Sequence, residues 1–309
     1  MNSKTKGYAL GIIAAATYGM NPLFALPLYA DGMDTNSVLF FRYLFAIIIV
    51  GIMTHMRGHS LKLTRREFLP VAAMGILAAL SSLTLFMSYH YMAAGIASTI
   101  LFVYPILVAL IMTFFFGEKL TLQTILCITL ALFGIGLLYK NEQGDTLNAT
   151  GIAFVMASAL SYAIYIVGVN RPLLRQIPTV RLTFYVLLFG VLLFIGTTHG
   201  CTTLTLPTRW YYWLNLIALA VFPTAVSFFC TTLAVQYIGS TPTAILGAME
   251  PVVAVIFGVT LFGEPFTQRI LTGIVVIIIS VTLVIAGSSF TAVLLRFRKL
   301  FPRIRRRKS

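Results

Sequence analysis

The sequence predicts an all-α polytopic membrane protein in which ten helices form two five-helix repeats of opposite topology. Three observations predict it: an apolar composition, a regular series of apolar segments, and an internal repeat. Of the 309 residues, 59% are apolar and 10% are charged, and the mean hydropathy is +0.95. A soluble domain carries about 25% charged residues and needs a largely polar surface. This composition therefore excludes soluble, disordered and disulfide-rich secreted proteins.

Ten apolar segments follow one another along the chain, each near the length of helix that spans about 30 Å of hydrocarbon. They cover residues 7–29, 36–56, 67–89, 94–116, 122–139, 150–170, 179–198, 210–236, 241–262 and 268–288. The first segment is too long for a signal peptide and contains Pro22 and Pro27, so we expect it to be the first membrane helix.

Basic residues predict the orientation of these helices. The chain has 22 Lys and Arg residues, eight acidic residues and a net charge of +14. With ten crossings, 18 of the 22 lie on the side of the termini, and Lys140, Arg209 and Arg269 lie on the opposite side. Because Lys and Arg accumulate on the cytoplasmic side, we expect both termini in the cytoplasm of a bacterial inner membrane. The basic tail, residues 291–309, is expected to contact anionic lipid headgroups and no nucleic acid, since no recognition fold accompanies it.

The two halves of the chain resemble each other at nearly constant offsets. An offset of 146 aligns Tyr91 with Tyr237, Pro105 with Pro251 and Phe116-Gly117-Glu118 with Phe262-Gly263-Glu264, and an offset of 144 aligns Gly7 with Gly151 and Tyr18 with Tyr162. We therefore divide the chain into two five-helix repeats, residues 1–143 and 144–290, followed by the tail. Because five is odd, the repeats must enter the membrane from opposite sides. Inverted repeats are typical of alternating-access transporters with a midplane site; a duplicated bundle without a transport role is the alternative.

Glu250 is the strongest candidate for a functional residue. It lies about 15 Å into the ninth segment, near the bilayer centre, where an ionisable side chain indicates function by default. Pro251 predicts a kink and a free carbonyl at Gly247. The repeat places Tyr104-Pro105 opposite Glu250, so both side chains should line one cavity suited to an amine, a cation or a proton. The alternative is a protonated, hydrogen-bonded structural Glu.

Arg42 is the second ionisable residue within a predicted span. It lies about 9 Å from the outer face, so its guanidinium can either snorkel to the interface or face the cavity and pair with Glu250 or with an anionic group. Polar side chains beside proline breaks recur at transporter sites.

Such side chains extend the candidate substrate site to Tyr18 and Asn21 in the first segment and to Tyr162 and Tyr165 in the sixth. We expect the first, second, fourth, sixth and ninth helices to line the cavity, with Pro22, Pro105 and Pro251 as hinges.

No catalytic or metal-binding motif is present. The three cysteines are widely spaced and form no CxxC pair, and His55 and His59 lack a nearby third ligand. Phosphate-loop, HExxH and GxSxG motifs do not occur. We therefore expect no metal, no cofactor and no catalytic residue; an intramembrane enzyme or a sensor would be the alternative, and an enzyme would need a second acid, a histidine or a nucleophile near Glu250.

The order and spacing of these residues resemble the EamA family of the drug/metabolite transporter superfamily, with two tandem EamA units. The resemblance rests on Tyr18-Gly19 with Asn21, Arg42, the segment ALSYAIYIVGVNR, Tyr104-Pro105, Glu250-Pro251 and the two Phe-Gly-Glu triplets. Tyr18 replaces the family's usual tryptophan, and Tyr104 stands where a second Glu-Pro pair would complete the repeat.

The resemblance implies ten helices, cytoplasmic termini, a central cavity and secondary transport. Its members often export amino acids or other small metabolites, here with a proton as a candidate coupling ion. A flippase for a lipid-linked group and a multidrug or cation efflux protein are the alternatives. Substrate, direction, coupling ion and oligomeric state stay open.

Overall fold

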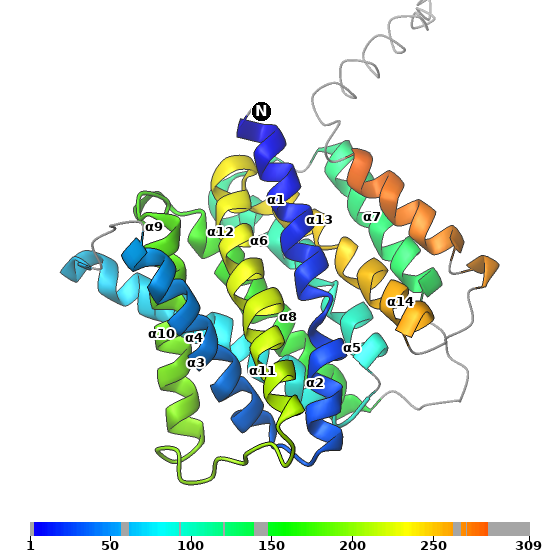
Figure 1. Ribbon diagram of the computed structural model, residues 1–309. Coiled ribbons are helices and arrows are strands. Elements are labelled where there is room, and N and C mark those ends of the chain that lie inside the picture. Colours follow the sequence, from blue (N-terminus) through cyan, green and yellow to red (C-terminus); the bar gives the residue numbers. More distant parts are fainter. Residues whose placement is uncertain are drawn as a thin grey trace, which may run out of the picture.

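The computed structural model describes residues 3–56, 62–92, 94–119, 121–138, 148–261, 267–269 and 271–283, which contain helices and no strand (Figure 1). The helices of the first half are α1 (Ser3–Tyr18), α2 (Asn21–Ala30), α3 (Thr35–Met56), α4 (Arg65–Ser88), α5 (Ala94–Leu101), α6 (Tyr104–Phe116) and α7 (Leu122–Leu138). Those of the second half are α8 (Ala149–Val169), α9 (Pro172–Arg175), α10 (Thr179–Thr197), α11 (Tyr211–Ala220), the π-helix η1 (Val221–Val226), α12 (Ser227–Ile238), α13 (Ser240–Leu246), α14 (Met249–Leu261) and an unlabelled helix, Leu271–Leu283.

Every predicted apolar segment contains helix in its described part. Among the described residues, six helical stretches are long and apolar enough to cross a membrane; α1 and α2 together form one of them, and α11, η1 and α12 together form another. Three shorter apolar helices, Tyr104–Phe116, Leu122–Leu137 and Leu271–Leu283, lie in the fourth, fifth and tenth predicted segments. The chain is therefore an α-helical, multi-pass membrane protein. The basic tail and the second Phe-Gly-Glu triplet lie outside the described residues.

Three of the predicted segments are broken into two helices each. The breaks separate α1 from α2, α5 from α6 and α13 from α14, and Pro22, Pro105 and Pro251 stand within the first three residues of the helix that follows each break. Proline is tolerated there because those backbone nitrogens have no intrahelical acceptor. The prolines therefore begin new helices.

The kink and the free carbonyl predicted at Gly247 are wrong. Helix α13 ends at Leu246, and the Glu250 backbone nitrogen donates to the Gly247 carbonyl over 2.8 Å. A tight turn between two short helices satisfies this carbonyl, which a bent but continuous helix would have left exposed.

The eighth predicted segment contains a π-helical turn instead of a break. Pro223 lies within η1, and its missing N–H is accommodated by one wider turn. The Thr224 hydroxyl donates to the Leu219 carbonyl over 2.8 Å, which satisfies one of the carbonyls in the widened turn. The turn leaves the Pro223 carbonyl available to a neighbouring helix.

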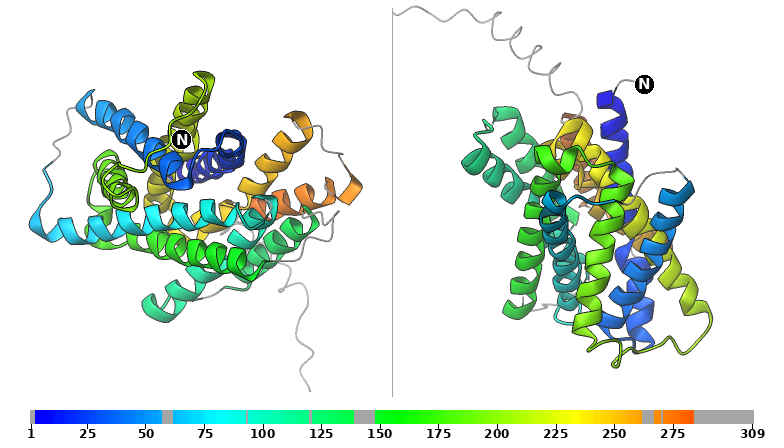
Figure 2. Two further views of the ribbon diagram at one scale, coloured as in Figure 1. Left: turned by 90° about the horizontal axis from the view of Figure 1, so that it is seen from below. Right: turned by 90° about the vertical axis from the view of Figure 1, so that its left-hand side faces the viewer.

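The two halves are interleaved rather than side by side. Helix α4 packs along α8, and α1 packs along α12 (Figures 1 and 2). Ser158 donates to the Ser81 carbonyl over 2.7 Å in the first contact, and Ser227 donates to the Ala14 carbonyl over 3.0 Å in the second. Ser81 and Ser227 differ by the 146-residue offset, and Ala14 and Ser158 differ by the 144-residue offset. Equivalent positions therefore make equivalent contacts between the halves.

The glycines matched by the repeat make a second pair of equivalent contacts. Gly7 lies against the side chain of Tyr237, and Gly151 lies against Tyr91. In both places a Cβ atom would meet the neighbouring segment at 3.0 Å or less: the end of α12 at Gly7 and the turn after α4 at Gly151. Small residues allow close helix approach in membranes, so the same close contact forms in both halves.

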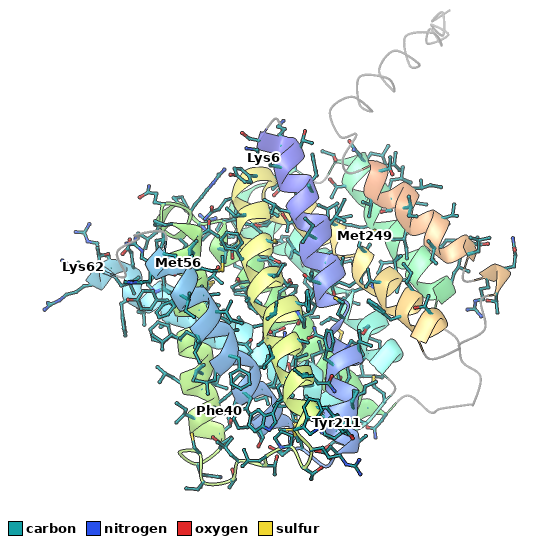
Figure 3. The ribbon with its side chains drawn as sticks, in the orientation of Figure 1. Lys6, Phe40, Met56, Lys62, Tyr211 and Met249 are labelled. Atoms are coloured by element: carbon teal, nitrogen blue, oxygen red, sulfur yellow. The ribbon has the colours of Figure 1, made fainter. Side chains whose placement is uncertain are left out.

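Large apolar side chains are exposed on the outward surface, and the labelled residues in Figure 3 show which parts of the chain lie at each end of the bundle. Phe114, Phe115 and Leu122 are 77–79% exposed, which suits a lipid environment and not water. Lys6 and Lys62 lie toward the end that carries the N-terminus, whereas Tyr211 lies toward the other end (Figure 3). The end of helix Leu271–Leu283 lies on the same side as the N-terminus (Figure 1).

We predict that Gly151→Leu destabilises the protein because the new side chain must displace Tyr91 and Met92, which pack where the side chain would lie. Overpacking of this kind costs about 1–3 kcal/mol. Gly136→Leu is the matched control, since nothing lies within 4 Å of a Cβ at that position. Thermal unfolding of the detergent-purified variants measures the difference; equal melting temperatures for the two variants would contradict the prediction.

Candidate substrate site

The breaks in the first and ninth predicted helices touch each other. Gly19, in the turn between α1 and α2, lies directly against the backbone carbonyl of Glu250, and a side chain at position 19 would collide with it. The break in the first helix is therefore held against the first turn of α14. This contact brings the chain around Tyr18 and Asn21 beside the buried carboxylate.

Glu250 and Tyr104 meet as the repeat predicts. Both side chains are buried, and the Tyr104 hydroxyl lies within hydrogen-bonding reach of the Glu250 carboxyl group. The same hydroxyl occupies the place where a side chain at position 247 would begin. Tyr104 therefore fills the space beside Gly247, and glycine is required there for Tyr104 to reach Glu250.

Stacked tyrosines surround this pair. The rings of Tyr18 and Tyr162, which are matched by the repeat, are stacked with centroids 5.9 Å apart and an interplanar angle of 10°. Tyr162 also meets Tyr104 edge-on at 5.0 Å and stacks on Tyr165 at 6.1 Å. Glu250 interacts electrostatically with Tyr18, Tyr104 and Tyr162. Residues related by the repeat thus pair with each other around one carboxyl group.

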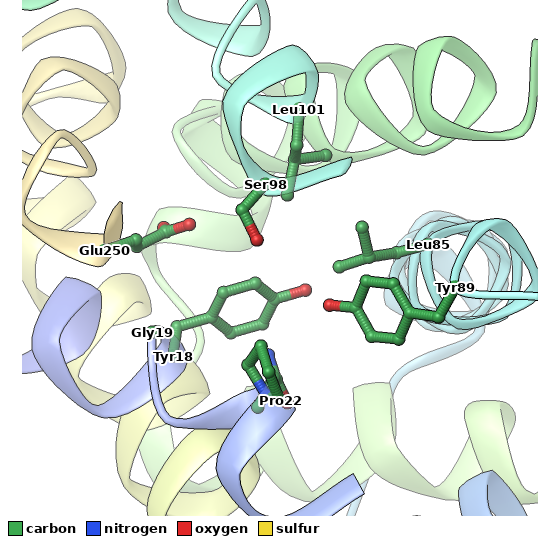
Figure 4. A pocket seen from close by; sticks show the side chains of 9 residues that line it. Tyr18, Gly19, Pro22, Leu85, Tyr89, Ser98, Leu101 and Glu250 are labelled. Atoms are coloured by element: carbon green, nitrogen blue, oxygen red, sulfur yellow. The ribbon is translucent and has the colours of Figure 1, made fainter. Parts of the chain in front are cut away.

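A small pocket opens beside Glu250 (Figure 4). It holds about 260 Å³ of empty space, including its open side. It is lined by Tyr18, Gly19, Asn21, Pro22, Leu85, Tyr89, Ser98, Leu101 and Glu250. In Figure 4 the hydroxyls of Tyr18 and Tyr89 point toward each other, and the Ser98 hydroxyl points into the same space as the Glu250 carboxylate.

The helices that line this pocket differ from those expected. The lining comes from α1, α2, α4, α5 and α14 and their turns, which correspond to the first, third, fourth and ninth predicted helices. The second and sixth helices, α3 and α8, are expected at the cavity but contribute no residue to this lining. Tyr162 of α8 contacts the rings of Tyr18 and Tyr104, and Tyr165 stacks on Tyr162.

Asn21 is the first residue of α2 and lines the pocket. Its side chain is 2% exposed, and within the described part of the chain neither its amide nitrogen nor its amide oxygen has a hydrogen-bond partner. Buried polar groups are normally paired, so these two atoms need an explanation. The helix break places the amide at the pocket instead of inside a continuous helix.

Arg42 does not snorkel and does not pair with Glu250. Its side chain is fully buried; Nε donates to the Thr224 hydroxyl over 2.5 Å, and Nη2 donates to the Pro223 carbonyl over 3.2 Å. The guanidinium lies 5.1 Å from the ring centre of Phe86, within cation–π range. Arg42 therefore clamps α3 to the carbonyl that the π-helical turn exposes.

Four pocket residues were not anticipated: Leu85 and Tyr89 of the third predicted helix, and Ser98 and Leu101 of the fourth. Ser98 is a polar residue within an apolar span. Polar residues inside a membrane span often mark a functional site, so this criterion would have selected Ser98 from the sequence. Tyr89 ends its span, where a tyrosine is usually read as an interface residue. Leucines in an apolar segment carry no signal.

We predict that Gly247→Ala lowers the melting temperature because the added methyl group meets the Tyr104 hydroxyl. The cost should be about 1–3 kcal/mol. Tyr104→Phe removes the obstructing hydroxyl, so the double variant should lose less stability than the sum of the single variants, with a coupling of about 0.5 kcal/mol or more. Gly196→Ala, at a site with nothing within 4 Å, is the control. Additive losses would show that the two positions do not interact.

Comparison with known protein families identifies the family of this chain. The model of the EamA-like transporter family matches residues 5–140 and 149–286. A protein of Archaeoglobus fulgidus named "Uncharacterized transporter" is 28% identical over 268 residues, 86% of this chain and 92% of its own length. A protein of the same name from Clostridium kluyveri is 23% identical, over 89% of this chain and 91% of its own.

A solved crystal structure supports the fold. It superposes with a TM-score of 0.75 at 19% sequence identity, over 96% of this chain and 99% of the other. The two family matches cover the two halves of the chain in tandem. The chain therefore belongs to the EamA-like transporter family and is a multi-pass membrane transporter built from two tandem EamA units.

Proposed function

We propose that this protein is a secondary-active transporter that exports small metabolites, amino acids or other amines among them, across the inner membrane by alternating access. Glu250 binds either a proton or the amine of the substrate. The observation that carries this proposal is the meeting of repeat-related residues at one buried carboxyl group, Tyr104 with Glu250 and Tyr18 with Tyr162, beside a pocket. A site at the centre of a duplicated bundle is where transporters of inverted topology bind substrate.

The packing of the halves supports ten spans with inverted repeats. A two-fold relation between the halves gives equivalent contacts on both sides of its axis, and the Ser81–Ser158 and Ala14–Ser227 contacts form such a pair. Both ends of the described chain lie on one side of the bundle, in keeping with an even number of crossings. We place both termini in the cytoplasm on the distribution of Lys and Arg and the basic tail against anionic headgroups.

The chemistry of the pocket favours a small polar solute over the alternatives, because a buried carboxyl group, an amide and three hydroxyl groups line it. An intramembrane enzyme would need a second acid, a histidine or a nucleophile beside Glu250. The described lining offers one carboxyl group, no histidine and no cysteine, and its one serine, Ser98, has no histidine in the lining to activate it. Comparing small solutes and lipid-linked precursors retained by cells that lack the protein would separate an exporter from a flippase.

We predict that Glu250→Gln lowers transport about tenfold to a hundredfold, since a hydrogen bond or ion pair to a charged group contributes about 1.5–3 kcal/mol. The variant should stay folded because the Gln amide oxygen can still accept from Tyr104. Efflux of a labelled amino acid and amine mixture from proteoliposomes measures transport, and thermal unfolding measures folding. Glu118→Gln, at the exposed end of α6, is the control. Normal efflux by the folded Glu250→Gln variant would remove Glu250 from the mechanism.

We predict that a membrane-impermeant maleimide labels the native protein at Cys201 in intact cells. Cys201 is exposed in the turn after α10, whereas Cys127 and Cys230 are buried. With cytoplasmic termini, this turn faces the periplasm, which a small impermeant maleimide reaches without crossing the inner membrane. Cys201→Ser should abolish the labelling. If labelling required permeabilised cells, the topology would be the reverse of the one proposed.

A further inference from the structure

The Asn21 amide presents an unused hydrogen-bonding pair to the pocket. Its nitrogen can donate, its oxygen can accept, and neither atom has a partner within the described residues although the side chain is 2% exposed. Leaving two such atoms buried and unpaired is costly. A ligand that offers both an acceptor and a donor at this point would satisfy them together.

The charge of the pocket restricts that ligand further. Its described lining has one carboxyl group, Glu250, and no Lys, Arg or His. Arg42 is a buried cation that acts on the lining tyrosines, and its guanidinium donates to the Pro223 carbonyl and to Thr224. An ammonium group therefore has an oppositely charged partner in the pocket, whereas a carboxylate or a phosphate finds no cation among the described lining residues.

We propose that the pocket selects small amines that carry a carboxamide and no free carboxylate, with the ammonium at Glu250 and the carboxamide at Asn21. A carboxamide pairs with the Asn21 amide through two complementary hydrogen bonds. A carboxylate offers acceptors alone, so it would leave the Asn21 oxygen unpaired and face Glu250 with like charge. This selectivity rests on the proposed function in that it takes the pocket as the substrate site.

The test is ligand binding to the purified full-length protein, read as a shift in thermal unfolding and titrated for affinity. The probes are L-alaninamide and L-alanine at equal millimolar concentrations, which differ in the carboxamide alone. We expect L-alaninamide to raise the melting temperature of the wild type and L-alanine to leave it unchanged. Equal shifts with both probes, or no shift with L-alaninamide, would overturn the proposal.

Substitution of Asn21 separates loss of binding from loss of folding. Asn21→Leu removes two unpaired polar atoms, so the unliganded variant should melt no lower than the wild type, while its affinity for L-alaninamide should fall about tenfold or more. Asn21→Asp lacks the amide donor, so its affinity for L-alaninamide should fall by a similar factor. Asn215→Leu, in α11 and outside the pocket lining, should bind as the wild type does. Unchanged affinity in Asn21→Leu would overturn the role of the amide.

Failure of this selectivity and failure of the transport proposal give different results. If Glu250-dependent efflux moves L-alanine as well as L-alaninamide, the protein is a transporter and the selectivity is wrong. If L-alaninamide binds in an Asn21-dependent way but no solute crosses the proteoliposome membrane, the binding site stands and the transport proposal falls.

Discussion

A helix cannot be interrupted inside a bilayer unless protein satisfies the backbone groups that the interruption frees. Three interrupted helices of the described chain come together around Glu250. The carbonyl of Gly247 accepts from the Glu250 nitrogen within its own turn, and the carbonyl of Glu250 packs on Gly19. Residues at or beside all three breaks line the pocket or contact Glu250.

The duplicated architecture makes the site nearly symmetric, and its chemistry depends on the departure from symmetry. Tyr18 and Tyr162 are the same residue in both halves and simply stack. Tyr104 and Glu250 are different residues at matched positions, so a hydrogen-bond donor faces an acceptor. One carboxyl group at the centre can hold one cation at a time. Two matched carboxyl groups would repel each other when both are ionised.

Much of the site could be predicted because the repeat relates distant residues without knowledge of the packing. The juxtaposition of Tyr104 and Glu250 followed from the offset of 146, and every apolar segment contains helix. The wrong predictions concern residues whose type is compatible with two different local structures. Pro251 can kink a helix or begin one, and the Gly247–Ala248 turn decided between them. Arg42 can reach water or protein, and the π-helical turn at Pro223 offered it an acceptor inside.

By itself the sequence determined that the chain is a membrane protein of two similar halves with one strong candidate carboxylate, because composition, charge distribution and internal offsets are properties of the chain alone. Tertiary structure decided which helices line the pocket and which atoms remain unpaired there. Tyr89 and Ser98 reach the pocket through the packing of α4 and α5, and the Asn21 amide is left without a partner by its neighbours. Such contacts depend on the distances between helices that are far apart in the sequence. The pattern of apolar residues within each helix does not determine these distances.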